Sequence, residues 1–242
     1  MIKYKLKITD IIEEAKETKT YYFEKPEDFT WEAGSHTHLA LLGFDEGDRP
    51  NKNLVRHMSI MNLPEENKVG ITTRIPANNP SEFKSKLSKL NIGDEVVIFK
   101  IASKLALKPS ERPVVFLSMG VGIAALKPVI KTYLKDTSLV PTLTNINVDS
   151  SKEFIYKDEL DSLTNESYTN LWLDSRQAFY EKLEEVSNIE NALYYIIGSY
   201  TFLKDTTAKL IAKNKTVLDV VLDVRENTVN VLFGIEIIAF KK

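Results

Sequence analysis

Residues 114–125 read VVFLSMGVGIAA and hold the most informative pattern in the chain. The apolar run Val114–Leu117 is typical of a buried strand, and a helical pattern extends from Ile123 to Leu134. Between them lies Gly120-Val121-Gly122, where the glycines permit a tight turn and a close approach of the backbone to a ligand phosphate. The pattern GxGxxA is a permitted but weak form of the GxGxxG fingerprint, so a plain strand-to-helix turn is the alternative.

The residues that follow continue to alternate between strand and helix. Strands are predicted over Leu139–Ile146, Tyr168–Leu173 and Tyr194–Ile197, and helices over Lys157–Leu163, Ala178–Val186 and Phe202–Ala212. Gly198 and Ser199 follow the last of these strands, at the carboxyl edge where open α/β sheets bind their ligands. We therefore expect a doubly wound parallel sheet over residues 109–242.

The first hundred residues show short strand patterns separated by turns. Apolar side chains recur at every second residue from Ile2 to Ile8. Further β-rich runs lie at Ser35–Leu42, Arg56–Met61, Lys68–Ile75 and Glu95–Lys100. One helix is predicted over Ser81–Leu90. Short strands at this spacing indicate an antiparallel barrel or sandwich over residues 1–108, and Lys108–Pro113 suits a linker between two domains.

The composition excludes several classes of function. Of the 242 residues 43% are hydrophobic and 27% charged, enough for a packed core, and the net charge of −2 gives no electrostatic reason to expect nucleic acid as a partner. The absence of cysteine excludes disulfides, iron–sulfur clusters and thiol catalysis within the chain. No apolar run approaches the ~20 residues of a membrane span, and the N-terminus lacks the apolar run of a signal peptide, so we expect a cytoplasmic protein.

Two segments of the first domain point to a phosphate-bearing ligand. Arg56 stands in a predicted strand, and a guanidinium can clamp a diphosphate through two hydrogen bonds. Ser81 opens the predicted helix, whose first N–H groups are free to bind an anion. Together they predict a dinucleotide site. The alternative is structural, because a strand arginine often pairs with a surface carboxylate and a serine often only caps its helix.

In their order along the chain these segments resemble the ferredoxin–NADP reductase-like flavoprotein superfamily, and the resemblance covers nearly the whole chain. The RxYS motif of that family falls on Arg56–Ser59, and its GxxS loop on Asn78–Ser81. The following L-x-x-G-D-x-V corresponds to Leu90–Val96, GxGIAP to Gly120–Ala125, and C-G-P to Ile197–Ser199. Four positions depart from the family pattern: Met58 replaces tyrosine, Asn78 glycine, Ala125 proline and Ile197 cysteine.

The resemblance implies an FAD-binding antiparallel β-barrel followed by an NAD(P)-binding domain. It assigns the flavin diphosphate to Arg56 and Ser81, a packing contact with the flavin ring to Met58, and a catalytic place near flavin N5 to the Ser59 hydroxyl. The residues bordering the flavin would be His57, Thr72, Thr73 and Arg74. Those holding the nicotinamide nucleotide would be Gly120, Val121, Gly122, Ile123, Ser175, Arg176, Gly198 and Ser199.

The choice between NADPH and NADH stays open at this point. Ser175-Arg176 matches a pair that binds the 2′-phosphate of NADPH in relatives, whereas the preceding Asp174 would repel a phosphate and favours NADH. Of the two, the Ser175-Arg176 match favours NADPH. The resemblance further implies electron transfer from NAD(P)H to a separate acceptor: ferredoxin, flavodoxin, a haem protein or a small molecule.

Other chemistries find less support in the sequence. His36 and His38 alternate along a strand and share one side of it, but no third ligand at suitable spacing accompanies them, so no metal site is predicted. The chain has no G-x-S-x-G nucleophile motif and no P-loop. Two alternatives to a flavoprotein oxidoreductase remain: a non-catalytic binding or assembly module of the same fold, and a flavin reductase that uses flavin as a substrate.

Overall fold

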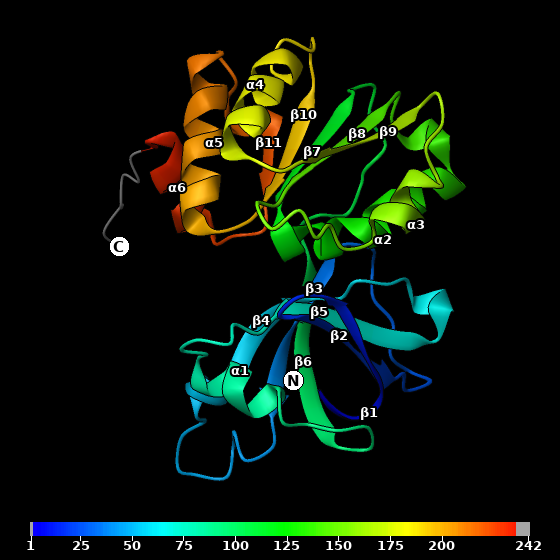
Figure 1. Cartoon of the computed structure of the whole chain (residues 1–242), viewed down its shortest axis with the longest axis vertical. Helices are drawn as coiled ribbons and strands as arrows, with labels where there is room; N and C mark the ends of the chain where they lie inside the picture. Colours follow the sequence, from blue (N-terminus) through cyan, green and yellow to red (C-terminus); the bar gives the residue numbers. More distant parts are fainter. Residues whose placement is uncertain (1, 236–242) are drawn as a thin grey trace, which may run out of the picture. The chain divides into compact units, whose positions relative to one another are not determined.

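A computed structural model describes residues 2–235 (Figure 1). The chain divides into two compact units. Unit 1 runs to Ala106 and includes Ala124–Thr132, and unit 2 comprises Leu107–Ile123 and the residues from Tyr133 onward. The division into functional domains at residues 108 and 109 stays a prediction. No helix within the described part is long and apolar enough to cross a membrane.

Unit 1 is built on an antiparallel sheet, as predicted. Within the described residues its six strands are β1 (Lys3–Ala15), β2 (Thr18–Glu24), β3 (Ser35–Leu41), β4 (Val55–Ser59), β5 (Lys68–Arg74) and β6 (Glu95–Ser103). Their order is β4-β3-β6-β1-β2-β5, and every neighbouring pair is antiparallel. The sheet is barrel-like but not closed, because the outer strands β4 and β5 are not paired with each other.

The core of unit 1 follows from the period of two in its strands. Leu6 and Ile8 of β1 are buried while Lys7 between them is exposed, as an alternating strand requires. A short helix, α1 (Glu82–Leu87), adds Phe83 and Leu87 to this core. Its first turn is capped by the Ser81 hydroxyl, which accepts a hydrogen bond from the Lys84 amide at 3.4 Å.

Unit 2 is a parallel sheet with helices, also as predicted. Its described strands are β7 (Val114–Met119), β8 (Leu143–Val148), β9 (Tyr168–Leu173), β10 (Leu193–Ile197) and β11 (Val220–Leu222). Its helices are α3 (Lys157–Asp161), α4 (Arg176–Val186), α5 (Tyr200–Ala212) and α6 (Glu226–Phe233). The helix α2 (Ile123–Lys135) follows β7 in the chain, and its residues Ala124–Thr132 belong to unit 1. Short 3-10 helices of unit 2 are η3 (Gly120–Gly122), η4 (Thr137–Leu139) and η5 (Val217–Asp219), and those of unit 1 are η1 (Lys52–Leu54) and η2 (Pro64–Glu66).

The strand order β11-β10-β7-β8-β9 determines where a ligand can bind. The chain runs outward from the central β7 through β8 to β9, then returns to the other side of β7 to form β10 and β11. The order therefore reverses between β7 and β10, and open α/β sheets bind ligands at such a reversal, outside the carboxyl ends of the strands. The turns after β7 and β10 meet at that place.

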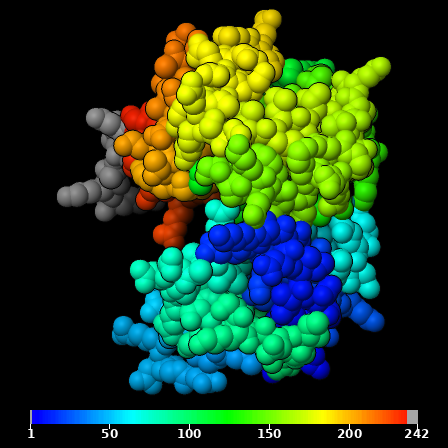
Figure 2. All heavy atoms as spheres, viewed as in Figure 1, coloured from blue at the N-terminus to red at the C-terminus, as the bar shows by residue number. Residues whose placement is uncertain are grey.

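One face of this sheet is closed by α4 and α5. Phe179 and Leu183 of α4 and Phe202 of α5 are buried against the apolar side chains of β7, β8 and β10. The space-filling view shows side chains of α4, in yellow, and α5, in orange, covering the sheet on the side that faces the viewer (Figure 2). This packing fixes the helix starts at the ends of the strands that precede them.

Candidate functional site

Arg56 lies on β4 and its side chain is held in place by the turn that precedes the strand. Its Nη1 donates to the carbonyl oxygens of Lys52 and Asn53, each at 3.3 Å, and of Val55 at 2.7 Å. The guanidinium carbon lies 5.4 Å from the centre of the Phe83 ring, a cation–π distance. These contacts occupy Nη1 and one face of the group. Among residues 2–235 no hydrogen-bond partner is found for Nη2 and Nε, which are therefore available to a ligand that binds beside α1.

Lys84 brings a second positive charge to Arg56, and the sequence patterns did not predict it. Its ammonium group is hydrogen-bonded to the hydroxyl of Thr73, which is buried in β5. Burial, and next the charge of Arg56, lower the pKa of Lys84 to about 8. Among the described residues no carboxylate pairs with Lys84. Two neighbouring cations without a counter-ion form an electrostatic site for an anion.

The predicted residues of the first domain divide into those near this site and those committed elsewhere. Ser81 caps α1, which is the structural role given above as the alternative to ligand binding, and Lys84 lies in the same helix. Thr72 lies within the sheet, where its hydroxyl is 2.7 Å from that of Thr20. Arg74 is exposed at the end of β5. Thr73 is the strand residue that reaches Lys84.

The three histidines of the chain gather on β3 and β4. Pairing of β3 with β4 sets His38 opposite His57, and the His36 and His57 rings are 3.8 Å apart between centroids, a contact that spacing along the chain does not reveal. The expectation that these histidines form no metal site stays a prediction. Burial, followed by the charges of Lys100 and His36, lowers the pKa of His38. Next to His57, Met58 packs against the core and Ser59 is half-buried.

In unit 2 the turn after β7 is held in place by a buried side-chain amide, that of Asn147. Gly120 has a φ of +54°, in the left-handed region that favours glycine. The Asn147 side chain on β8 donates to the Ser118 hydroxyl at 2.8 Å and to the Gly120 carbonyl at 3.1 Å. Asn147 is 1% exposed and was not predicted. It fixes the orientation of the peptide group at which η3 begins.

Glycines also mark the closest approach of the β7 and β10 turns. A Cβ atom at Gly122 would lie 2.9 Å from the carbonyl oxygen of Ile197, which is closer than real contacts allow. A Cβ at Gly198 would lie 2.6 Å from the Phe202 ring. Both turns thus keep bare backbone at the reversal of strand order. Ser199 caps α5, because its hydroxyl accepts a hydrogen bond from the Phe202 amide at 3.2 Å. Val121 lies in η3, and the buried Ile123 is the first residue of α2.

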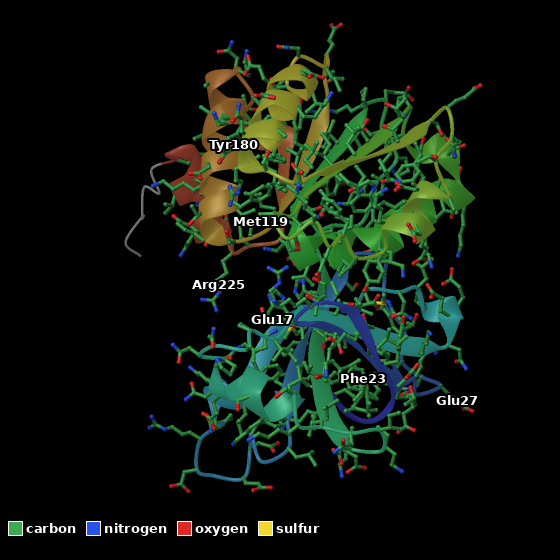
Figure 3. All side chains as sticks on the ribbon, in the orientation of Figure 1. Glu17, Phe23, Glu27, Met119, Tyr180 and Arg225 are labelled. Atoms are coloured by element: carbon green, nitrogen blue, oxygen red, sulfur yellow. The ribbon has the colours of Figure 1, made fainter. Side chains whose placement is uncertain are left out.

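Ser175 and Arg176 have separate roles at the start of α4. The Ser175 hydroxyl is the helix cap and accepts from the Ala178 amide at 3.2 Å. Arg176 turns toward the end of β7, where its Nη2 donates to the Met119 sulfur at 3.3 Å, while its Nη1 donates to the Tyr180 hydroxyl at 3.2 Å. Met119 and Tyr180 are labelled in Figure 3. Arg176 therefore lies beside the β7 turn rather than at the outer edge of β9.

Comparison with solved structures agrees with this arrangement. No family model matches the chain, and no curated protein does. A ferredoxin NADP+ reductase from Neisseria gonorrhoeae, with bound FAD and NADP, is 16% identical and superposes with a TM-score of 0.77, covering 91% of this chain and 98% of that one. This chain has the ferredoxin–NADP reductase fold.

Two further structures share the reductase fold. The flavohem-like FAD/NAD binding domain of nitric oxide dioxygenase from Vibrio cholerae is 18% identical, with a TM-score of 0.72 and coverage of 91% of this chain and 98% of that one. The CS-b5R domains of human Ncb5or, in the NAD+ form, are 14% identical, with a TM-score of 0.74 and coverage of 92% and 70%.

Within the reductase fold, Asn147 provides a direct test of how the β7 turn is held. Replacing it with leucine leaves the Gly120 carbonyl without its amide donor, which is expected to lower the free energy of unfolding by about 1–3 kcal/mol in urea denaturation. The matched control is Asn188→Leu, because Asn188 donates to the Glu184 carbonyl but is exposed, so a change below about 0.5 kcal/mol is expected. Equal losses in the two variants would contradict the role of Asn147.

Proposed function

We propose that this chain is an FAD-dependent oxidoreductase that passes electrons between NAD(P)H and a separate acceptor. The observation that carries the proposal is the pair of cations Arg56 and Lys84: the charge of Arg56 acts on Lys84, and neither has a carboxylate partner among the described residues. A diphosphate is an anion of matching charge, and a guanidinium binds it through parallel hydrogen bonds. The β7 and β10 turns of unit 2 supply the bare backbone that a second nucleotide needs.

In this proposal the residues of unit 1 position the flavin. FAD, when bound, supplies the redox chemistry, since it accepts a hydride and can release electrons singly. Arg56 and Ser81 would hold the diphosphate, Met58 would pack against the ring system, and the Ser59 hydroxyl would border the part of the ring that receives the hydride. His57, Thr72, Thr73 and Arg74 border the remaining groups. The methionine thioether is apolar and polarisable, so it can pack on an aromatic ring without the hydroxyl of tyrosine.

The residues of unit 2 position the nicotinamide nucleotide. We assign its diphosphate to the turn formed by Gly120, Val121, Gly122 and Ile123, with Gly198 and Ser199 on the opposite side. Arg176 lies beside Met119 at the same turn, and Ser175 caps the next helix. Efficient hydride transfer requires the two reacting atoms to approach within about 3–3.5 Å, so this positioning is the main contribution of the protein.

We propose NADPH as the preferred nucleotide because Asp174 is paired. Lys152 lies 2.9 Å from the Asp174 carboxylate. A hydrogen bond from Lys152, and next its charge, hold the pKa of Asp174 below its ordinary value. Asp174 is thus ionised but its charge is matched, which reduces the repulsion of a 2′-phosphate that its sequence position suggested.

This assignment predicts a change of preference in Lys152→Glu. Reversing the charge leaves Asp174 beside a second carboxylate, and the ratio of kcat/KM for NADPH to that for NADH is expected to fall about two- to fivefold, the scale of an exposed charge interaction. Lys157→Glu on α3 is the control, because Lys157 pairs with Asp161 instead. An unchanged or increased ratio in Lys152→Glu would show that this pair does not face the nucleotide.

The electron acceptor is a separate molecule in this proposal. The chain has no cysteine and so cannot ligate an iron–sulfur cluster through its own thiolates. Ferredoxin, flavodoxin, a haem protein and a small molecule remain the candidate acceptors, and the cytoplasmic location expected from the sequence stays a prediction.

The visible absorption spectrum of the purified protein tests the proposed function. A flavin spectrum that bleaches on anaerobic addition of NADPH or NADH is the expected result. Flavin that binds but is lost in gel filtration would indicate a flavin reductase that uses flavin as a substrate. A colourless protein that takes up no added FAD would overturn the proposal and favour a binding or assembly module.

A further inference from the structure

Lys84 lies in surroundings that a surface lysine does not ordinarily have. It is half-buried on α1, its ammonium contacts a buried threonine hydroxyl, and its charged neighbour is another cation, Arg56. Lysine burial without a carboxylate is costly, because the charged form loses hydration and gains repulsion. The next lysine on the same helix, Lys86, shows the ordinary arrangement: it is exposed and pairs with Glu82 at 3.0 Å.

We propose that Lys84 binds the flavin diphosphate together with Arg56, and that Lys84 takes up a proton when the diphosphate binds. This inference rests on the proposed function, and it adds a second phosphate-binding residue and a pH dependence to it. Binding of FAD is then coupled to protonation of the Lys84 amine.

The charges around Lys84 determine the direction of the coupling. The positive charge of Arg56 on β4 acts on Lys84 and favours the neutral form of its amine. The neighbouring β5 contributes the neutral Thr73 hydroxyl and ends in the exposed Arg74. On α1 itself, the charges of Glu82 and Lys86 are paired with each other. Without a ligand, the surroundings therefore favour loss of the proton from Lys84.

Binding of a diphosphate reverses this balance. With its pKa near 8, Lys84 is largely neutral above pH 8 in the unliganded protein. Two negative phosphate charges next to the amine favour the ammonium form and raise its pKa. Each complex formed between pH 8 and the raised pKa thus takes up to one proton from solution, and the affinity for FAD must fall as the pH rises through that interval.

The experiment is calorimetric titration of flavin-free protein with FAD at pH 8.5, in two buffers with different heats of ionisation. We expect between half a proton and one proton to be taken up per FAD bound, and a dissociation constant that rises about five- to tenfold between pH 7.5 and 9. Measurement on the unaltered chain needs no variant, so a folding defect cannot produce the result.

Two variants assign the proton to its residue. Lys84→Gln is expected to abolish the proton uptake, to remove most of the pH dependence between pH 7.5 and 9, and to weaken FAD binding at pH 7.5 about tenfold or more, the scale of one charge-assisted hydrogen bond. Lys86→Gln, two residues along α1, should behave as the unaltered protein.

The possible outcomes separate this inference from the proposed function. FAD binding without proton uptake, or uptake that persists in Lys84→Gln, would overturn the role of Lys84 while leaving the flavoprotein assignment in place. An unaltered chain that binds no FAD would overturn both.

Discussion

Replacement of Arg56 with alanine is expected to weaken FAD binding at least about 100-fold. A guanidinium that clamps a diphosphate contributes two charge-assisted hydrogen bonds of about 1.5–3 kcal/mol each, and every 1.4 kcal/mol corresponds to a factor of about ten in affinity. The group is already oriented by the Val55 carbonyl at 2.7 Å and by the Phe83 ring, so little conformational entropy is lost when a ligand binds. The measurement is the dissociation constant of FAD from quenching of flavin fluorescence.

Two further variants give this prediction its control and its chemical detail. Arg49→Ala removes an exposed arginine of the same unit, and its affinity for FAD should remain within about twofold of the unaltered protein. Arg56→Lys keeps the charge but lacks the planar fork, so an intermediate loss is expected. Equal affinities for FAD in Arg56→Ala and Arg49→Ala would remove the diphosphate site from β4.

The sequence predicted Arg56 but not Lys84, because Arg56 is marked by a local sequence motif and Lys84 only by its tertiary surroundings. Arg56 belongs to a local motif whose spacing is visible along the chain. Lys84 is one of three lysines between residues 84 and 89, and nothing local separates it from Lys86 or Lys89. Its character comes from β4 and β5, which the fold brings to the same side of α1. Charge without a counter-ion is a property of the tertiary structure.

Asn147 and the histidine cluster were missed for a related reason. Asn147 stands in a strand, where a polar side chain ordinarily weakens the prediction, and its partners lie 27 and 29 residues away. The contact between His36 and His57 depends on the register of β3 against β4, and a period of two places side chains on a face without fixing their neighbours.

Segments with a strong period were predicted most accurately. The predicted strand Tyr168–Leu173 agrees with β9 at both ends. The predicted strand Leu139–Ile146 begins too early, because η4 ends at Leu139 and Pro141 precedes the first paired residue, Leu143. The short strand β11 was not predicted, because a three-residue strand carries too little pattern to be recognised. The helix α6 was not predicted either.

Replacement of Gly122 with valine is expected to abolish reduction by the nicotinamide nucleotide while FAD binding persists. The new Cβ would lie 2.9 Å from the Ile197 carbonyl oxygen and 3.1 Å from its Cγ2 atom. The strands cannot easily separate, because Ile197 is paired with Ser118 in the parallel register of β10 and β7. The turn must therefore move, and the backbone that we assign to the diphosphate moves with it. We expect the rate of flavin reduction at a fixed NADPH concentration to fall at least about 100-fold, the scale known for small displacements of positioning groups.

The two readouts of this variant test the assignment of the turn separately from the stability of the chain. Overpacking of this kind costs about 1–3 kcal/mol, so the smaller Gly122→Ala should remain folded and show a partial loss of reduction rate. Gly47→Ala is the control, because a Cβ there meets only the Arg49 carbonyl at 3.7 Å. A Gly122→Val protein that binds FAD and is reduced at the normal rate would show that the nucleotide does not use this turn. Loss of FAD binding together with loss of flavin reduction would instead indicate that the damage extends beyond unit 2. Gly122→Ala would then distinguish displacement of the turn from general loss of stability, because it introduces the same contact with the smallest possible side chain.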